Sequence, residues 1–213
     1  MKRSFLLIAF ILYSCHTFSQ TDPKAQEILK GVSAKYKSYK SLSAAFKLNL
    51  LDKKTNKSSN QNGTVTLKGT MYNLTMADQQ VLSDGKLIWT YLKESNEVQI
   101  SESDGKTDAL SPTNIFTLYE KGFKSKFIGE KKVGTSNVQQ IELYPEDNKK
   151  NYFKIVINIA KAEKYVNSAK VFDKNGNIYT YAITKFTPNA VVSDDFFTFD
   201  KKKFPGVEVV DLR

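Results

Sequence analysis

The sequence predicts a mainly β (α+β) domain, built from an antiparallel sheet of about eleven short strands that curls towards a barrel. Two observations support this fold class. Apolar residues alternate with polar ones through most of the chain, and turn signals such as Asn175-Gly176 separate the runs. Helical spacing is confined to residues 23–39 and 111–122, so the sheet carries most of the structure.

The first residues have the pattern of a cleavable signal peptide. Lys2 and Arg3 precede an apolar run at 5–12, which is too short to span a bilayer because that needs about 20 residues. Small residues follow, so we expect a signal peptide over 1–19 and export to the periplasm. The alternative for this segment is a buried N-terminal helix.

A second alternative concerns Cys15. The tetrapeptide at 12–15, Leu-Tyr-Ser-Cys, resembles a lipobox, in which Cys15 would be acylated and would begin the mature chain. In either case no other run approaches membrane length, and 20–213 has the size of one ordinary domain.

The composition argues against an enzyme. The chain has one Cys and one His, Cys15 and His16, and both lie in the expected leader. Without thiol or imidazole, the mature chain lacks Ser-His-Asp and Cys-His nucleophile systems and the usual zinc ligands. We therefore expect no catalytic residue, no metal and no cofactor.

The charge of +10 comes mostly from scattered lysines. Such a distribution is typical of a solvated surface, and attraction to anionic lipid or an acidic partner is the alternative. No basic motif is interleaved with aromatic residues, so we expect no nucleic-acid partner, and we expect a monomer.

The first predicted element of the mature chain is an amphipathic helix at 23–39. Asp22 supplies an N-cap and Pro23 occupies the first helical position. The apolar residues recur at helical spacing: Ile28, Leu29, Val32 and Tyr36.

The strands follow, interrupted by a polar loop at 52–62 and by a short helix that begins at Ser111-Pro112 and ends at Gly122. That helix carries Ile115, Phe116 and Tyr119. The predicted strands lie at 44–51, 63–68, 71–76, 79–83, 86–92, 97–101, 123–132, 138–143, 152–160, 165–172 and 178–186, with short final pieces at 197–199 and 207–211.

One face of several strands is unusually apolar and rich in aromatic residues. We expect this face to line a ligand-binding cavity, because the few predicted helices have little apolar area with which to cover it. The alternative is that the helices fill the concavity as an ordinary core. The candidate lining residues are Phe46, Leu48, Leu50, Tyr72, Leu74, Met76, Leu87, Trp89, Tyr91, Phe153, Ile155 and Ile157.

Residues 82–91, Leu-Ser-Asp-Gly-Lys-Leu-Ile-Trp-Thr-Tyr, resemble the SDGK-x-x-W-x-Y hairpin of the periplasmic outer-membrane lipoprotein carriers, the LolA-like family. Residues 197–199 and 205–209 resemble that family's FTF…P-x-GV-x-V ending. The opening helix followed by 43–46, and the region 63–74, also match in placement.

The resemblance implies an incomplete antiparallel β-barrel closed by a lid of two or three helices. It implies that the protein takes acylated lipoproteins from an inner-membrane lipoprotein-releasing complex and passes their acyl chains to an outer-membrane acceptor. By the same resemblance, Trp89 and Tyr91 belong to the hydrophobic region, and the helix near Ile115 and Phe116 belongs to the lid. We include Ile115, Phe116 and Tyr119 among the candidate ligand-binding residues.

The chain departs from the family pattern at one position. The family carries an Arg after the strand lysine, where it holds the lid closed, whereas Lys68 is followed here by Gly69. Two further functions stay open: a LolA-like lipid-sensing or regulatory binding domain, and an anchored outer-membrane acceptor if Cys15 is lipidated.

Overall fold

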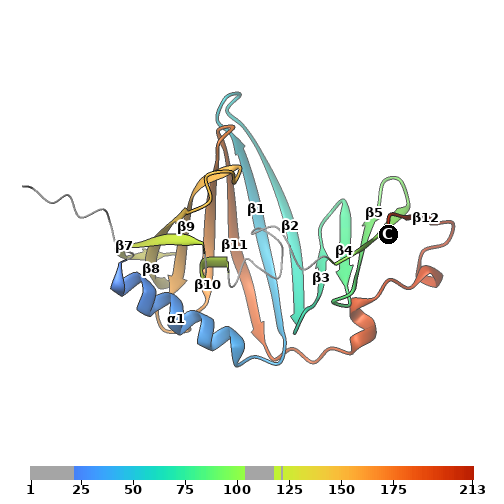
Figure 1. The fold of residues 1–213 in the computed structure, drawn as a ribbon, viewed down its shortest axis with the longest axis horizontal. Helices are drawn as coiled ribbons and strands as arrows, with labels where there is room; N and C mark the ends of the chain where they lie inside the picture. The colour runs from blue at the N-terminus through green and yellow to red at the C-terminus, as the bar shows by residue number, and fades with distance from the viewer. Residues whose placement is uncertain (1–21, 104–117, 121) are drawn as a thin grey trace, which may run out of the picture.

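The computed structural model describes residues 22–103, 118–120 and 122–213. The expected signal peptide and the predicted lid residues Ile115 and Phe116 lie outside this part of the chain. Twelve strands form one sheet in the order β12-β6-β5-β4-β3-β2-β1-β11-β10-β9-β8-β7 (Figure 1). Neighbouring strands are antiparallel, except that β12 joins β6 in parallel. The strands are β1 (Leu42–Asp52), β2 (Lys57–Lys68), β3 (Met71–Thr75), β4 (Gln79–Ser83), β5 (Leu87–Leu92), β6 (Glu97–Glu102), β7 (Phe123–Val133), β8 (Ser136–Pro145), β9 (Tyr152–Ala160), β10 (Val166–Asp173), β11 (Asn177–Pro188) and β12 (Glu208–Asp211).

The predicted incomplete barrel is confirmed only in part: the strands form a mainly antiparallel sheet that is not closed into a barrel. The sheet is open, and its edge strands β7 and β12 lie at opposite ends of the molecule (Figure 1). Closure depends on the tilt and stagger accumulated over all strands, and the alternation of apolar residues within a strand holds no information on either.

The predicted lid of two or three helices is not supported. In the described part of the chain, α1 (Pro23–Lys37) is the only α-helix, and the other helices are short 3₁₀ turns: η1 (Leu118–Glu120), η2 (Asp194–Phe197) and η3 (Lys201–Lys203). Most of the second predicted helix falls outside that part.

The predicted loop at 52–62 is shorter in the structure. β1 and β2 form a long hairpin whose connection is only residues 53–56, because polar side chains pair across it. The Asn49 amide donates to Ser58 Oγ at 2.7 Å and to Asn60 Oδ1 at 3.0 Å. Pairing with β1 therefore outweighs the low strand propensity of these residues.

The helix α1 begins where the sequence predicts, and Asp22 explains why. Its Oδ1 accepts hydrogen bonds from the backbone N–H groups of Lys24 and Ala25, as an N-cap does. Its Oδ2 accepts from the backbone N–H of Phe127 in β7 at 3.0 Å. The bond from Phe127 is the main reason that the pKa of Asp22 lies below its usual value. One side chain thus caps the helix and fastens it to the sheet.

The apolar side of α1 packs on the half of the sheet formed by β7 to β11. Near its C-terminal end, the Tyr36 hydroxyl accepts a hydrogen bond from the backbone N–H of Val166 at 3.1 Å. The helix is therefore held to the sheet near both ends. The buried cluster beneath it contains Ala25, Leu29, Val32, Tyr119, Ile141, Leu143, Tyr152, Ile155, Ile157, Ile159, Val166, Ala169 and Val171.

We call the face of the sheet that contacts α1 the inner face, and the opposite one the outer face. The segment after β11, residues 189–207, packs on the outer face of the other half of the sheet. The Asn73 amide donates to the backbone oxygen of Phe196 at 2.8 Å, and Phe197 is completely buried. Residues 197–199, predicted as a strand, instead belong to η2 and the residues that follow it.

We predict opposite effects for two glycine substitutions. A Cβ on Gly63 would clash with the Phe46 ring and lie 2.9 Å from Cε1, whereas a Cβ on Gly31, in α1, would contact nothing within 4 Å. Gly63→Ala should therefore lower the free energy of unfolding by about 1–3 kcal/mol through overpacking. Gly31→Ala should raise it by roughly 0.5–1 kcal/mol, because alanine favours the helix. Urea denaturation followed by circular dichroism measures both, and a stabilised Gly63→Ala would contradict the packing described here.

Candidate functional site

The strand registers bring one group of predicted residues together on the inner face. Side chains of directly paired residues point to the same side of a sheet. Phe46 pairs with Ile183, and Leu48 pairs with Tyr181. These four side chains pack around one cluster with Tyr36 of α1, which identifies their side as the inner face.

The inner face continues from β1 across β2 to β3. Leu42 pairs with Leu67, which pairs with Tyr72, and in the next row Val65 pairs with Leu74. Leu48, Leu50, Leu74 and Met76 are only half-buried, in contrast to the closed core beneath α1. We call this side of β1 to β5 the apolar inner face. Phe46, Val65 and Tyr72 are its buried members, and its half-buried members are Leu48, Leu50, Leu67, Leu74, Met76, Val81, Ile88 and Leu92.

The structure does not place Leu87, Trp89 and Tyr91 on this face. Leu74 pairs with Val81, and Val81 pairs with Thr90. The inner face of β5 therefore carries Ile88, Thr90 and Leu92. The alternation in the sequence shows which residues of β5 share a side, but not whether that side is the inner or the outer face. Burial does not distinguish the two sides either, because all six residues of β5 are half-buried.

Tyr91 has a structural role on the outer face instead. Its ring centroid lies 4.5 Å from that of Phe204 and 5.8 Å from that of Phe199. Its hydroxyl donates to Asn96 Oδ1 at 3.0 Å, and the Asn96 amide donates to the backbone oxygen of Pro205. The hairpin that carries the family motif therefore anchors the segment 189–207.

Phe153 was expected on the inner face, and a β-bulge places it outside. The register between β9 and β10 shifts between the pairs Lys154–Phe172 and Tyr152–Asp173, so Phe153 is the extra residue. Tyr152 is buried under α1 in its place, and Phe153 is 51% exposed, with its ring centroid 6.2 Å from that of Phe172.

The remaining predicted residues that the structure describes lie in the core beneath α1. Ile155 and Ile157 are on the inner face, but they are 0% and 1% exposed beneath α1. Tyr119 lies in η1 and is buried against the same cluster. Sequence reasoning missed Val65, Val81 and Ile88 as inner-face residues, and only their registers with β3 and β4 reveal them.

Lys68 lies on the outer face and contacts the segment that follows β11. Its Nζ lies 2.6 Å from Asp194 Oδ1 and 3.4 Å from the backbone oxygen of Val192. Its alternate neighbour Thr66 donates a hydrogen bond to Ser43 on the outer face. Lys68 thus joins β2 to the start of η2, in an exposed ion pair of the kind that contributes at most about 1 kcal/mol.

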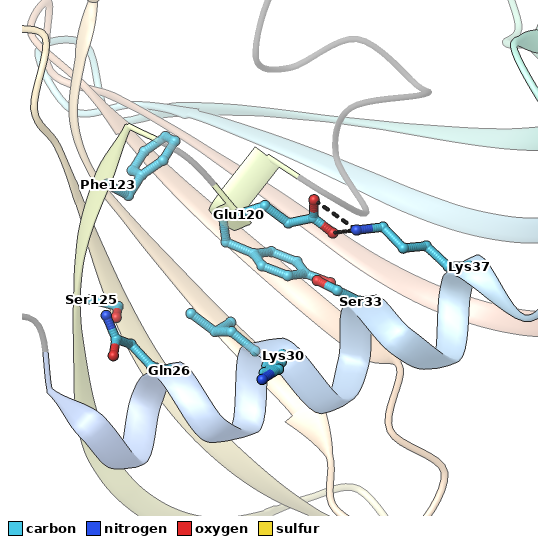
Figure 2. A pocket seen from close by; sticks show the side chains of 9 residues that line it. Gln26, Lys30, Ser33, Lys37, Glu120, Phe123 and Ser125 are labelled. Atoms are coloured by element: carbon cyan, nitrogen blue, oxygen red, sulfur yellow. Dashed lines mark hydrogen bonds and ion pairs between the residues drawn. The ribbon is translucent and has the colours of Figure 1, made fainter.

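A separate cavity of about 380 Å³ opens between α1, η1 and β7 (Figure 2). Its mouth carries an ion pair between Lys37 of the helix and Glu120 of η1, with 2.9 Å between Nζ and Oε1. Polar side chains of Gln26, Lys30 and Ser125 line its wall.

Two further observations limit the chemistry of the described residues. Within 22–103, 118–120 and 122–213, no three or more His, Cys, Asp or Glu side chains gather as they would around a metal ion. No helix in the same ranges has the length and apolar character needed to cross a bilayer.

The model of the family described as "Outer membrane lipoprotein carrier protein LolA" matches residues 37–200, well over half of the chain. The chain belongs to this family. The match begins at the end of α1 and runs through η2, so it includes the whole apolar inner face. No curated protein matches the chain significantly.

Two solved structures share this fold at low sequence identity, and a third is less similar. An uncharacterized conserved protein from Thermus thermophilus has a TM-score of 0.60 and 12% identity, covering 88% of this chain and 99% of that one. A DUF1329 family protein from Desulfovibrio piger has a TM-score of 0.50 and 13% identity, with 84% and 98% covered. A LolA superfamily protein from Nitrosomonas europaea has a TM-score of 0.44 and 12% identity, with 85% and 99% covered. At these identities the likeness concerns the fold alone.

Proposed function

We propose that this LolA family protein is a periplasmic carrier that binds the acyl chains of lipoproteins on its apolar inner face. One observation carries the proposal: each of the strands β1 to β5 presents at least one half-buried apolar side chain on that face. Apolar surface of this kind on a protein commonly marks a site for an apolar ligand or partner.

The energetics of acyl binding suit a carrier. Each CH₂ group removed from water contributes roughly 0.8 kcal/mol, so ten buried methylenes contribute about 8 kcal/mol before the cost of ordering the chain. A face that covers one side of each chain captures only part of that sum. Such partial burial gives a moderate affinity, which allows the acyl chains to be released again.

The helix α1 has a different role in this proposal from that of a lid. Asp22 holds its start to β7, Tyr36 holds its end to β10, and Ile155 and Ile157 fill the space beneath it. We therefore propose that cargo lies beside α1, against Phe46, Leu48, Leu50 and Leu74, and does not replace the helix on the sheet.

The proposed partners follow from the same function. The carrier would receive acylated lipoproteins from an inner-membrane lipoprotein-releasing complex and deliver them to an outer-membrane acceptor, acting as a monomer after removal of residues 1–19. If Cys15 is acylated, the protein is instead an anchored acceptor, and the mass of the mature N-terminus separates the two cases.

Release of a lipoprotein from membranes tests the proposal. The mature protein is added to inner-membrane vesicles that contain an acylated lipoprotein, and the supernatant is examined by native mass spectrometry. We expect a complex of the two proteins that retains the acyl groups. The matched control is the same lipoprotein with its N-terminal Cys replaced by Ser, which is not acylated and should not bind.

Other results would contradict the carrier function. Equal binding of the unacylated control would indicate a protein-binding regulatory domain. Free lipid in place of a lipoprotein complex would indicate a lipid sensor.

A further inference from the structure

The cavity between α1, η1 and β7 lies away from the apolar inner face, because β8 to β11 separate β7 from β1 in the sheet. Its wall is mixed (Figure 2). Leu29 and Phe123 are apolar, whereas Gln26, Ser33, Tyr119 and Ser125 carry polar side-chain groups. A wall of this composition favours a ligand that has both a polar and an apolar part.

Ser125 is the first sign of a polar ligand. The residue is 6% exposed, and its hydroxyl has no hydrogen-bond partner among the described residues. A buried hydroxyl without a partner destabilises a fold, so it calls for a specific explanation. The amide of Gln26, an exposed residue, lies beside Ser125 in Figure 2, and both residues line the cavity.

A second buried hydroxyl lines the same cavity. Tyr119 is buried and interacts with Ser33 of α1, and burial raises its pKa well above the ordinary value. Hydroxyls from η1, α1 and β7 thus gather at one place in the fold.

The charges at the cavity favour an anion. Of the two lysines in its lining, Lys37 is neutralised by Glu120. Lys30 has no carboxylate within ion-pair distance in the described ranges, and Glu120 is the only acidic residue in the lining described. The cavity consequently offers one cation and several hydrogen-bond donors.

We propose that this cavity binds the carboxylate or phosphate headgroup of a single-chain amphiphile, with Ser125 donating a hydrogen bond to the anion and Lys30 supplying the positive charge. Leu29 and Phe123 contact the first carbons of the chain. A volume of about 380 Å³ lies at the lower end of the range for small-molecule sites, so it suits a headgroup and a short apolar stretch. This site does not depend on lipoprotein binding at the apolar inner face.

Calorimetric titration of the mature protein tests the proposal with decanoate, decyl phosphate and the uncharged analogue 1-decanol. We expect Ser125→Ala and Lys30→Gln each to weaken binding of the two anions about tenfold and to leave that of decanol unchanged. The matched control is Lys35→Gln in the same helix, because Lys35 lies over the Tyr39 ring, away from the cavity. A preference for decanoate or for decyl phosphate identifies the headgroup.

Two further measurements keep the result independent of folding and of the proposed carrier function. The midpoint of thermal unfolding of Ser125→Ala should equal or exceed that of the unsubstituted protein, because the substitution removes an unpartnered buried hydroxyl. Decanoate should still bind to Leu48→Glu, a substitution on the apolar inner face.

The proposal is overturned if decanol binds as tightly as the anions, if neither anion binds, or if the two variants bind like the unsubstituted protein. A lower unfolding midpoint for Ser125→Ala would show that its hydroxyl is already satisfied. If inorganic phosphate bound as tightly as decyl phosphate, the alkyl chain would contribute nothing to binding, and a site for an amphiphile would be contradicted.

Discussion

Leu48→Glu is expected to weaken acyl binding on the order of 100-fold while the protein stays folded. Leu48 lies on the apolar inner face, half-buried between Phe46 and Leu50. Its replacement removes an apolar contact of roughly 1.5–3 kcal/mol, and an acyl chain that covers the new carboxylate must also desolvate it. Since each 1.4 kcal/mol is a factor of about ten, the two effects together exceed a hundredfold loss. Titration with a fluorescently labelled acylated lipoprotein measures the change, because a free fatty acid would also bind the cavity between α1, η1 and β7 proposed above.

The neighbouring residue provides the control. Lys47 lies on the outer face of the same strand and is exposed, so Lys47→Glu changes the charge by a larger amount without touching the apolar inner face. Its acyl affinity should stay within about twofold, because an exposed charge at this distance is screened. Undiminished binding by a folded Leu48→Glu, or an equal loss in Lys47→Glu, would refute the assignment of the site to this face.

Phe197→Ala is expected to lower the free energy of unfolding by about 3–5 kcal/mol, the range for removing a buried aromatic side chain. Phe197 is 0% exposed and lies where the segment 189–207 crosses the outer face. For a domain of this size, the loss corresponds to a fall in the midpoint of thermal unfolding on the order of 10 °C. Differential scanning calorimetry and urea denaturation give the two quantities.

Phe196 offers a matched comparison in the adjacent position. Its side chain is 45% exposed, with its ring edge-on to that of Phe197 at a centroid distance of 5.5 Å. Phe196→Ala should cost no more than about 1 kcal/mol, because the ring gives up little buried area. Similar effects for the two substitutions would mean that the segment 189–207 does not pack on the sheet as described.

The position of this segment gives the family hairpin a physical explanation. The motif at 82–91 contains a turn in which Asp84 accepts hydrogen bonds from the backbone N–H groups of Lys86 and Leu87 at 2.8 Å. Ser83 accepts from the backbone N–H of Gly85, whose φ of 91° suits glycine. The motif also carries Tyr91, which contacts Phe199 of the family's C-terminal ending and Phe204, which directly precedes its second part. The two parts of the sequence that resemble the family thus contact each other on the outer face.

The sequence predicted correctly the helix start and the turns that a few neighbouring residues build. Asp22 and Pro23 start α1, and Asp84-Gly85 and Asn175-Gly176 join paired strands. Each signal works because the cap or turn is built by neighbouring residues, so its outcome needs no knowledge of the rest of the chain.

Only the tertiary structure decided which side of each strand faces α1 and whether the sheet closes. A bulge at Phe153 exchanges the roles of Phe153 and Tyr152, and the register of β5 turns Trp89 away from Leu74. The physical reason is that a period of two relates residues within one strand, whereas the choice between the two faces depends on pairing with strands distant in the sequence. A shift of one residue in that pairing moves every following side chain of the strand to the opposite face of the sheet.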